Sequence, residues 1–177
     1  MRETADKLNN QAILLAQDGS YKEAIACFVR ALTIEKDNTL LWYNLGITYR
    51  DAGNTTAARE CLEHAHNIDE TDLEVIEELA LICFHTKDYD SALSYSYEGL
   101  DINPQDCNLW NTVGVVYFNK AEYKDAQEAF EMAVMINPYY FDALYNLRDT
   151  YKEVGNKPGE QECNLRLSQI KKRGENY

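Results

Sequence analysis

A period of 34 residues runs through this 177-residue chain and constrains its fold more than any other feature. When the sequence is shifted by 34, residues of the same kind fall on one another. A column of large apolar residues holds Leu8, Trp42, Ile76, Trp110 and Leu144, and a column of small residues holds Ala12, Gly46, Ala80 and Gly114. Such a period indicates a stack of similar units, because one short unit cannot bury its own apolar face.

Within one repeat, the apolar and small residues follow the spacing of an α-helix. They are Trp42, Leu45, Gly46 and Tyr49 in a first helix and Ala58, Leu62 and Ala65 in a second. Positions i, i+3, i+4 and i+7 form one stripe on a helix. Five repeats of two helices predict ten helices, with breaks near Gly19, Lys36, Gly53, Glu70, Lys87, Pro104, Ala121, Pro138 and Gly155.

The turn inside each repeat is marked by glycine in three of the five repeats. Gly19, Gly53 and Gly155 share one register, where a helix ends on a residue in the left-handed conformation. Lys87 and Ala121 occupy this register in the other two repeats, so we expect those two turns to be built differently.

Several residues are typical of helix starts. Ser20 with Glu23 predicts a capping box that opens a second helix. Asp72 and Asp106 suit the N-caps of the following repeats.

The pattern resembles the tetratricopeptide repeat family. Its residues are Trp42, Leu45, Gly46 and Tyr49, then Ala58, Leu62 and Ala65, and again Trp110, Val113, Gly114 and Tyr117, then Ala126, Phe130, Ala133 and Pro138. The resemblance implies an all-α fold, a right-handed superhelical solenoid of antiparallel helix pairs. We expect one domain over residues 1–177, with repeats at 5–38, 39–72, 73–106, 107–140 and 141–173. The fifth repeat ends in a divergent capping helix, and residues 174–177 are expected to be a frayed tail.

Charge and composition exclude several classes of function. The net charge of -13 repels phosphate, so we expect neither nucleic acid nor a membrane surface as partner. No apolar run reaches the ~18 residues of a membrane span. The 5 cysteines form no CxxC pair, which favours buried thiols in a reducing compartment. The predicted location is therefore the cytoplasm.

No residue pattern in the sequence supports catalysis. His64 and His66 lie two apart on a predicted helix, so their side chains point in different directions and do not share a metal. Neither a phosphate-binding glycine loop nor a nucleophile elbow occurs. We predict a protein that is not an enzyme and binds no cofactor or metal.

The resemblance implies that the first helix of each repeat lines a concave groove that binds a protein or peptide. The residues expected there are Asn9, Asn10, Ile13, Tyr43, Asn44, Ile47, Glu74, Glu77, Glu78, Leu81, Asn111, Thr112, Val115, Asp142, Tyr145 and Asn146. An Asn amide has both a donor and an acceptor, so it suits the backbone of an extended peptide. Asn also suits any half-exposed helix face, and the aliphatic residues of this set also suit a core.

Acidic residues dominate the centre of the predicted groove. Nine Asp and Glu lie between Asp69 and Glu98, opposed only by Lys87. This charge predicts a partner with a basic segment. It also argues against the terminal-carboxylate clamp of chaperone-binding members, because Glu74 and Glu78 replace the required cations.

The leading interpretation is a non-catalytic adaptor that binds an extended peptide or a partner protein. Two alternatives stay open: a dedicated secretion-type chaperone for one client, and a self-associating scaffold. In the second case, a homodimer would form through an exposed end of the stack, since no further helix is predicted before Ala5.

Overall fold

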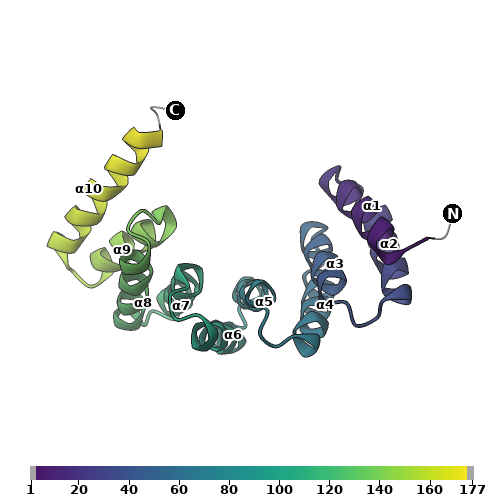
Figure 1. Cartoon of the computed structure of the whole chain (residues 1–177). Coiled ribbons are helices and arrows are strands. Elements are labelled where there is room, and N and C mark those ends of the chain that lie inside the picture. The colour runs from purple at the N-terminus through teal and green to yellow at the C-terminus, as the bar shows by residue number, and fades with distance from the viewer. Residues whose placement is uncertain (1–2, 175–177) are drawn as a thin grey trace. The chain divides into compact units, whose positions relative to one another are not determined.

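The computed structural model describes residues 3–174, with side chains up to residue 171, and consists of ten α-helices without a strand in that range. The helices are α1 (Ala5–Gln17), α2 (Tyr21–Ile34), α3 (Thr39–Asp51), α4 (Thr55–Ile68), α5 (Leu73–His85), α6 (Tyr89–Ile102), α7 (Cys107–Asn119), α8 (Tyr123–Ile136), α9 (Phe141–Glu153) and α10 (Lys157–Gly174). Successive helices form antiparallel pairs (Figure 1). The predicted helices and their breaks are confirmed.

The helices group into two compact units, Met1–Ile82 and Cys83–Tyr177, so that α5 contributes to both. In the first unit, the core joins the predicted large and small columns. Leu8, Leu41 and Leu45 are buried beside Ala12 and Phe28. In the second unit, the core contains Leu144 of the large apolar column and other buried residues of α8, α9 and α10: Ala126, Phe130, Ala133, Leu147, Cys163 and Leu167.

The small-residue column brings the two helices of a repeat into close contact. A Cβ atom at Gly46 would lie 2.9 Å from Cγ of Leu62 on α4. A Cβ atom at Gly114 would lie 2.6 Å from two ring carbons of Phe130 on α8. These glycines are required because α3 approaches α4, and α7 approaches α8, too closely for any side chain.

All five turns inside the repeats have the same backbone conformation, which corrects the expectation for two of them. Gly53 has a φ of 81°, and Lys87 and Ala121 have φ values of 62° and 60°. The hydrogen bonds also match: the N–H of Ala121 donates to the carbonyl of Phe118, as that of Gly53 does to Arg50. The left-handed turn is therefore fixed by the helix packing, even where the residue is not glycine.

The predicted helix caps are partly right. The carboxylate of Asp106 accepts hydrogen bonds from the N–H groups of Asn108 and Leu109, and Asp72 caps α5 in the same way. Ser20 does stand at the N-cap of α2, but its side chain accepts no cap hydrogen bond, so the capping box was wrong. Of the expected frayed tail, residue 174 is the end of α10, and residues 175–177 lie outside the described residues.

Candidate functional site

The residues expected to bind a partner lie on the first helices of the repeats, which are α1, α3 and α5 in the first unit and α7 and α9 in the second. All of them except Thr112 are exposed or half-buried. Thr112 is buried, and its hydroxyl donates to the backbone carbonyl of Asn108 at 3.0 Å, so its side chain is not presented to a partner.

Four of the predicted asparagines form two equivalent pairs across neighbouring repeats. Nδ2 of Asn44 donates to Oδ1 of Asn9 at 3.0 Å, and Nδ2 of Asn146 donates to Oδ1 of Asn111 at 3.0 Å. The donating amides, Asn44 and Asn146, keep an acceptor oxygen, and the accepting amides, Asn9 and Asn111, keep their N–H donors. Asn10 is exposed and belongs to neither pair. Each pair therefore holds two amides in a fixed orientation at the surface of one unit.

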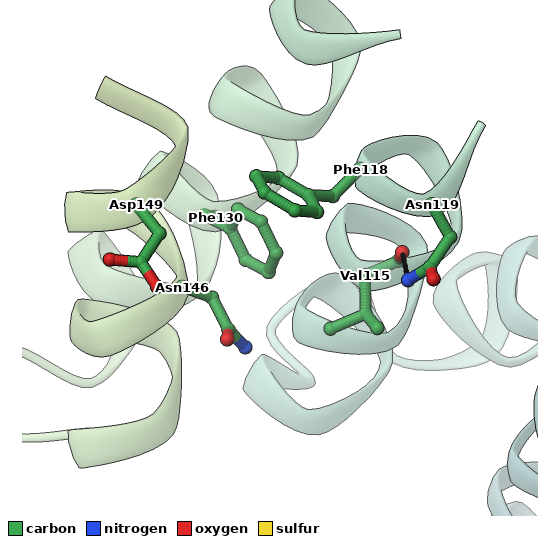
Figure 2. Close-up of a pocket in the computed structure, with 6 residues that line it drawn as sticks. All are labelled: Val115, Phe118, Asn119, Phe130, Asn146 and Asp149. Carbon is green, nitrogen blue, oxygen red and sulfur yellow. Dashed lines mark hydrogen bonds between the residues drawn. The ribbon is translucent and has the colours of Figure 1, made fainter. Parts of the chain in front are cut away.

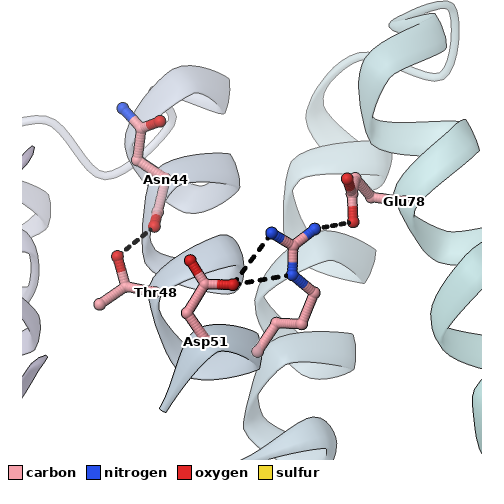
Figure 3. Close-up of polar contacts among 5 residues, drawn as sticks. Asn44, Thr48, Asp51 and Glu78 are labelled. Atoms are coloured by element: carbon pink, nitrogen blue, oxygen red, sulfur yellow. Dashed lines mark hydrogen bonds and ion pairs between the residues drawn. The ribbon is translucent and has the colours of Figure 1, made fainter. Parts of the chain in front are cut away.

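In the first unit, Asn44 of the amide pair shares α3 with Asp51, which belongs to a network of charged groups that also includes Glu78 of α5 (Figure 3). Arg50 donates to Oε2 of Glu78 at 2.6 Å and to Oδ1 of Asp51 at 3.0 Å. Lys87 is the only cation between Asp69 and Glu98 in the sequence, and in the structure Arg50 of α3 also pairs with a carboxylate of this cluster. Arg50 was missed because its partner lies in the next repeat, although its spacing from Tyr43 and Ile47 places it on the same helix face.

Tyr43 lies next to this network. Burial, together with the carboxylates of Glu78 and Glu74, raises the pKa of its hydroxyl above the ordinary value. Tyr43 thus stays neutral and keeps a hydroxyl donor for a ligand in an acidic environment.

In the second unit, a hollow of about 130 Å³ opens between α7 and α9, with Phe130 of α8 at its floor (Figure 2). Its lining consists of Val115, Phe118, Asn119, Phe130, Asn146 and Asp149. Val115 and Asn146 were expected at the site. Phe118 and Asn119 were not, although their spacing of three and four from Val115 indicates the same face of α7.

The exposed side of α9 carries a stack of flat side chains. The rings of Phe141 and Tyr145 stack with centroids 6.4 Å apart, and the guanidinium of Arg148 lies 4.0 Å from the centroid of the Tyr145 ring. Arg148 also donates to Oδ1 of Asp149 at 2.7 Å. The cation and the hydrogen bonds hold Tyr145 and Asp149 in place. Asp142 is exposed on the same helix.

Reactive chemistry has little support at these positions. Within residues 3–174, no group of His, Cys, Asp and Glu side chains is arranged to hold a metal ion. Burial raises the pKa of the Cys61 thiol to about 11, which keeps it protonated and unreactive near neutral pH. None of the described helices has the length and apolar character needed to cross a membrane.

Curated relatives of the chain include members of the BBSome complex and peroxisomal targeting signal receptors. The BBSome complex member BBS4 homolog of Drosophila melanogaster is 25% identical over 141 residues, which are 79% of this chain and 29% of the relative. The peroxisomal targeting signal receptor of Saccharomyces cerevisiae is 27% identical over 110 residues, which are 62% of this chain and 18% of the relative. The chain thus spans less than a third of the length of these relatives.

Solved structures share the fold over nearly the whole chain. A crystal structure of MamA superposes with a TM-score of 0.85 at 21% identity, covering 100% of this chain and 99% of MamA. PilF of Pseudomonas aeruginosa gives a TM-score of 0.83 at 16% identity, covering 94% of this chain and 76% of PilF.

Family models agree with the period, the helix pairs and these structural matches. Two models, both described as tetratricopeptide repeat, match residues 3–71 and 108–140, which together make up more than half of the chain. The chain is a member of the tetratricopeptide repeat family.

Proposed function

We propose that this protein is a non-catalytic adaptor whose first helices bind an extended segment of a partner protein. The observation that carries the proposal is the repeated amide pair, Asn9 with Asn44 and Asn111 with Asn146. An extended backbone offers alternating N–H and C=O groups, and a fixed pair of amides presents the complementary acceptor and donors. Repetition of the same pair in both units favours a ligand with a repeating backbone over a single small molecule.

The residues around the amide pairs supply side-chain contacts. Tyr43 and Ile47 lie beside the pair in the first unit, and Tyr145 and Val115 lie beside the pair in the second. They are only partly buried, so their apolar surface is open to a ligand. These contacts add apolar area without demanding one sequence.

We also propose that the bound segment is basic and that the protein acts in the cytoplasm. The net charge of -13 attracts a basic segment and speeds its association. In the first unit, Glu74 is exposed, whereas Glu78 is already paired with Arg50. The buried thiols of Cys27, Cys61 and Cys163 suit a reducing compartment.

Self-association through the outer face of α1 is less well supported than partner binding. Lys7 and Gln11 are exposed at the registers where Leu41 and Leu45 are buried in the next repeat. A second copy stacked there would bury the charge of Lys7, which is costly. Leu14 is apolar and 67% exposed on this face, and its equivalent in the next repeat, Thr48, is buried.

The experiment is a quantitative pull-down from native lysate with the full chain as bait, followed by titration of the recovered partner. Baits are wild type, Asn44→Ala, Asn146→Ala and the double variant. Each single change should weaken binding by roughly 0.5–1.5 kcal/mol, the net contribution of a typical hydrogen bond, and the double change should weaken it further.

Asn164→Ala is the matched control, because Asn164 is exposed on α10, which is the second helix of its repeat. Melting curves verify that every bait is folded. Equal recovery and equal affinity with all baits would refute binding through the amide pairs.

A further inference from the structure

The hollow of the second unit has an exact register counterpart in the first unit. Each of its residues lies 68 positions, or two repeats, after a residue of the first unit. The counterparts are Ile47 for Val115, Arg50 for Phe118, Asp51 for Asn119, Leu62 for Phe130, Glu78 for Asn146 and Leu81 for Asp149. The two places can therefore be compared residue by residue.

In the first unit, this register is occupied by a cationic side chain of the chain itself. Arg50 hydrogen bonds to Asp51 and Glu78, the counterparts of Asn119 and Asn146 (Figure 3). These two registers thus bind a guanidinium between the first helices of neighbouring repeats. In the second unit, Phe118 takes the register of Arg50, so the cation is absent and the hollow is open.

The polar groups around the hollow have acceptors to spare. Nδ2 of Asn119 donates to the carbonyl of Val115 at 2.8 Å, and Nδ2 of Asn146 donates to Asn111. Both hydrogen bonds from Arg148 go to Oδ1 of Asp149. Within the described part of the chain, Oδ1 of Asn119, Oδ1 of Asn146 and Oδ2 of Asp149 accept no hydrogen bond.

The rest of the lining is apolar and suits the stem of a long side chain. Val115, Phe118 and Phe130 form the floor and one wall (Figure 2). Lysine and arginine lay their aliphatic stems on such surfaces while their charged ends reach polar groups, and they carry donors without acceptors. A carboxylate in the hollow would instead be repelled by Asp149.

We propose that the hollow of the second unit binds one basic side chain, Lys or Arg, of the partner segment, in the register that Arg50 fills in the first unit. The bound cation shares Asp149 with Arg148, since a carboxylate accepts about four hydrogen bonds. This inference rests on the proposed binding of an extended segment and adds the chemistry of one subsite.

The test uses the full chain, labelled with ¹⁵N, and four nonapeptides of alternating Ser and Ala whose central residue is Lys, Arg, norleucine or Glu. Binding is followed by NMR through the side-chain amide signals of Asn119 and Asn146. The Lys or the Arg peptide should bind about tenfold more tightly than the norleucine peptide, because a hydrogen bond to a charged group outweighs a neutral contact. The Glu peptide should bind most weakly.

Two variants test the geometry. Asp149→Asn should remove most of the preference for the basic peptide, and Asp101→Asn, an equal change on the exposed end of α6, should keep it. Phe118→Arg places a guanidinium at the register of Arg50 and should abolish the preference by filling the hollow. If Phe118→Arg does not fold, the result with Asp149→Asn alone tests the basic subsite.

The outcomes separate this inference from the proposed function. If the Lys, Arg and norleucine peptides bind equally while Asn111→Ala weakens all of them, the groove binds peptides but the basic subsite is refuted. If no peptide shifts any signal of the first helices, peptide binding itself is refuted, and the subsite with it. An unchanged preference in Asp149→Asn would also overturn the subsite.

Discussion

Residues 39–72 of the first unit and 107–140 of the second are the two repeats with the fullest pattern, and they use the same framework differently. In both, the tryptophan indole donates to the preceding loop: Trp42 to the carbonyl of Lys36 at 2.7 Å, and Trp110 to that of Pro104 at 3.0 Å. In both, a buried glycine lets the second helix approach. The framework is therefore held by the residues that the pattern contains.

The two repeats also differ at three registers, two within the pattern and one outside it. Leu62 becomes Phe130, Gly53 becomes Ala121, and Arg50 becomes Phe118. The first change alters how tightly the helices pack, the second strains a turn, and the third opens a hollow. A repeat thus fixes its backbone with a few buried positions and leaves the exposed registers free to decide what it binds.

The largest expected difference concerns the glycines, where the two repeats meet different neighbours. Gly114→Leu should lower the free energy of unfolding by about 1–3 kcal/mol, as overpacking does. Gly46→Leu should cost less, because Leu62 turns aside more easily than the Phe130 ring, which a Cβ would meet at 2.6 Å. Urea unfolding followed by circular dichroism measures both. Equal midpoints for the two variants would show that the Phe130 ring gives way as readily as Leu62.

The turns should give a smaller effect of opposite sign in the two repeats. Gly53→Ala places a Cβ in the left-handed region and should cost about 1–2 kcal/mol. Ala121→Gly relieves the same strain at a φ of 60° and should stabilise, although by less, because glycine loses more entropy on folding. Thermal melting of both variants is the measurement. A destabilised Ala121→Gly would mean that the Ala121 methyl group has a favourable contact that outweighs its strain.

Much of the fold could be predicted because the period and the helical spacing depend only on residue type. The turn at Lys87 could not, because the sequence signals a left-handed residue only when it is glycine. There the packing of the flanking helices imposes a left-handed conformation, although a lysine by itself prefers a negative φ.

The candidate site was predicted less completely. The register predicted that Asn44 and Asn146 lie on the first helices of their repeats. It did not predict the hydrogen bonds that pair them with Asn9 and Asn111. These pairs join residues 35 apart, one more than the period, so matching columns cannot reveal them. The hollow depends on the shape left when Arg50 becomes Phe118, which is a property of side-chain volume rather than of the pattern.

The smallest expected effect concerns the two arginines that pair with carboxylates next to the amide pairs. Arg50→Gln should cost at most about 1 kcal/mol, since partly exposed ion pairs contribute little. Arg148→Gln should cost less still, because Asp149 is 41% exposed and regains water, whereas Glu78 is only 18% exposed and keeps less of its hydration. The Arg148→Gln variant also loses the contact between the guanidinium and the Tyr145 ring. This loss adds to the cost of the substitution, but only a little, because the ring is exposed. Melting at low and at 1 M salt tests this order, because the Debye length of about 3 Å at 1 M salt should shrink the Arg50 effect. If Arg148→Gln proves the more damaging change at both salt concentrations, the stack on α9 contributes more to the stability of the second unit than the ion pair contributes to the first.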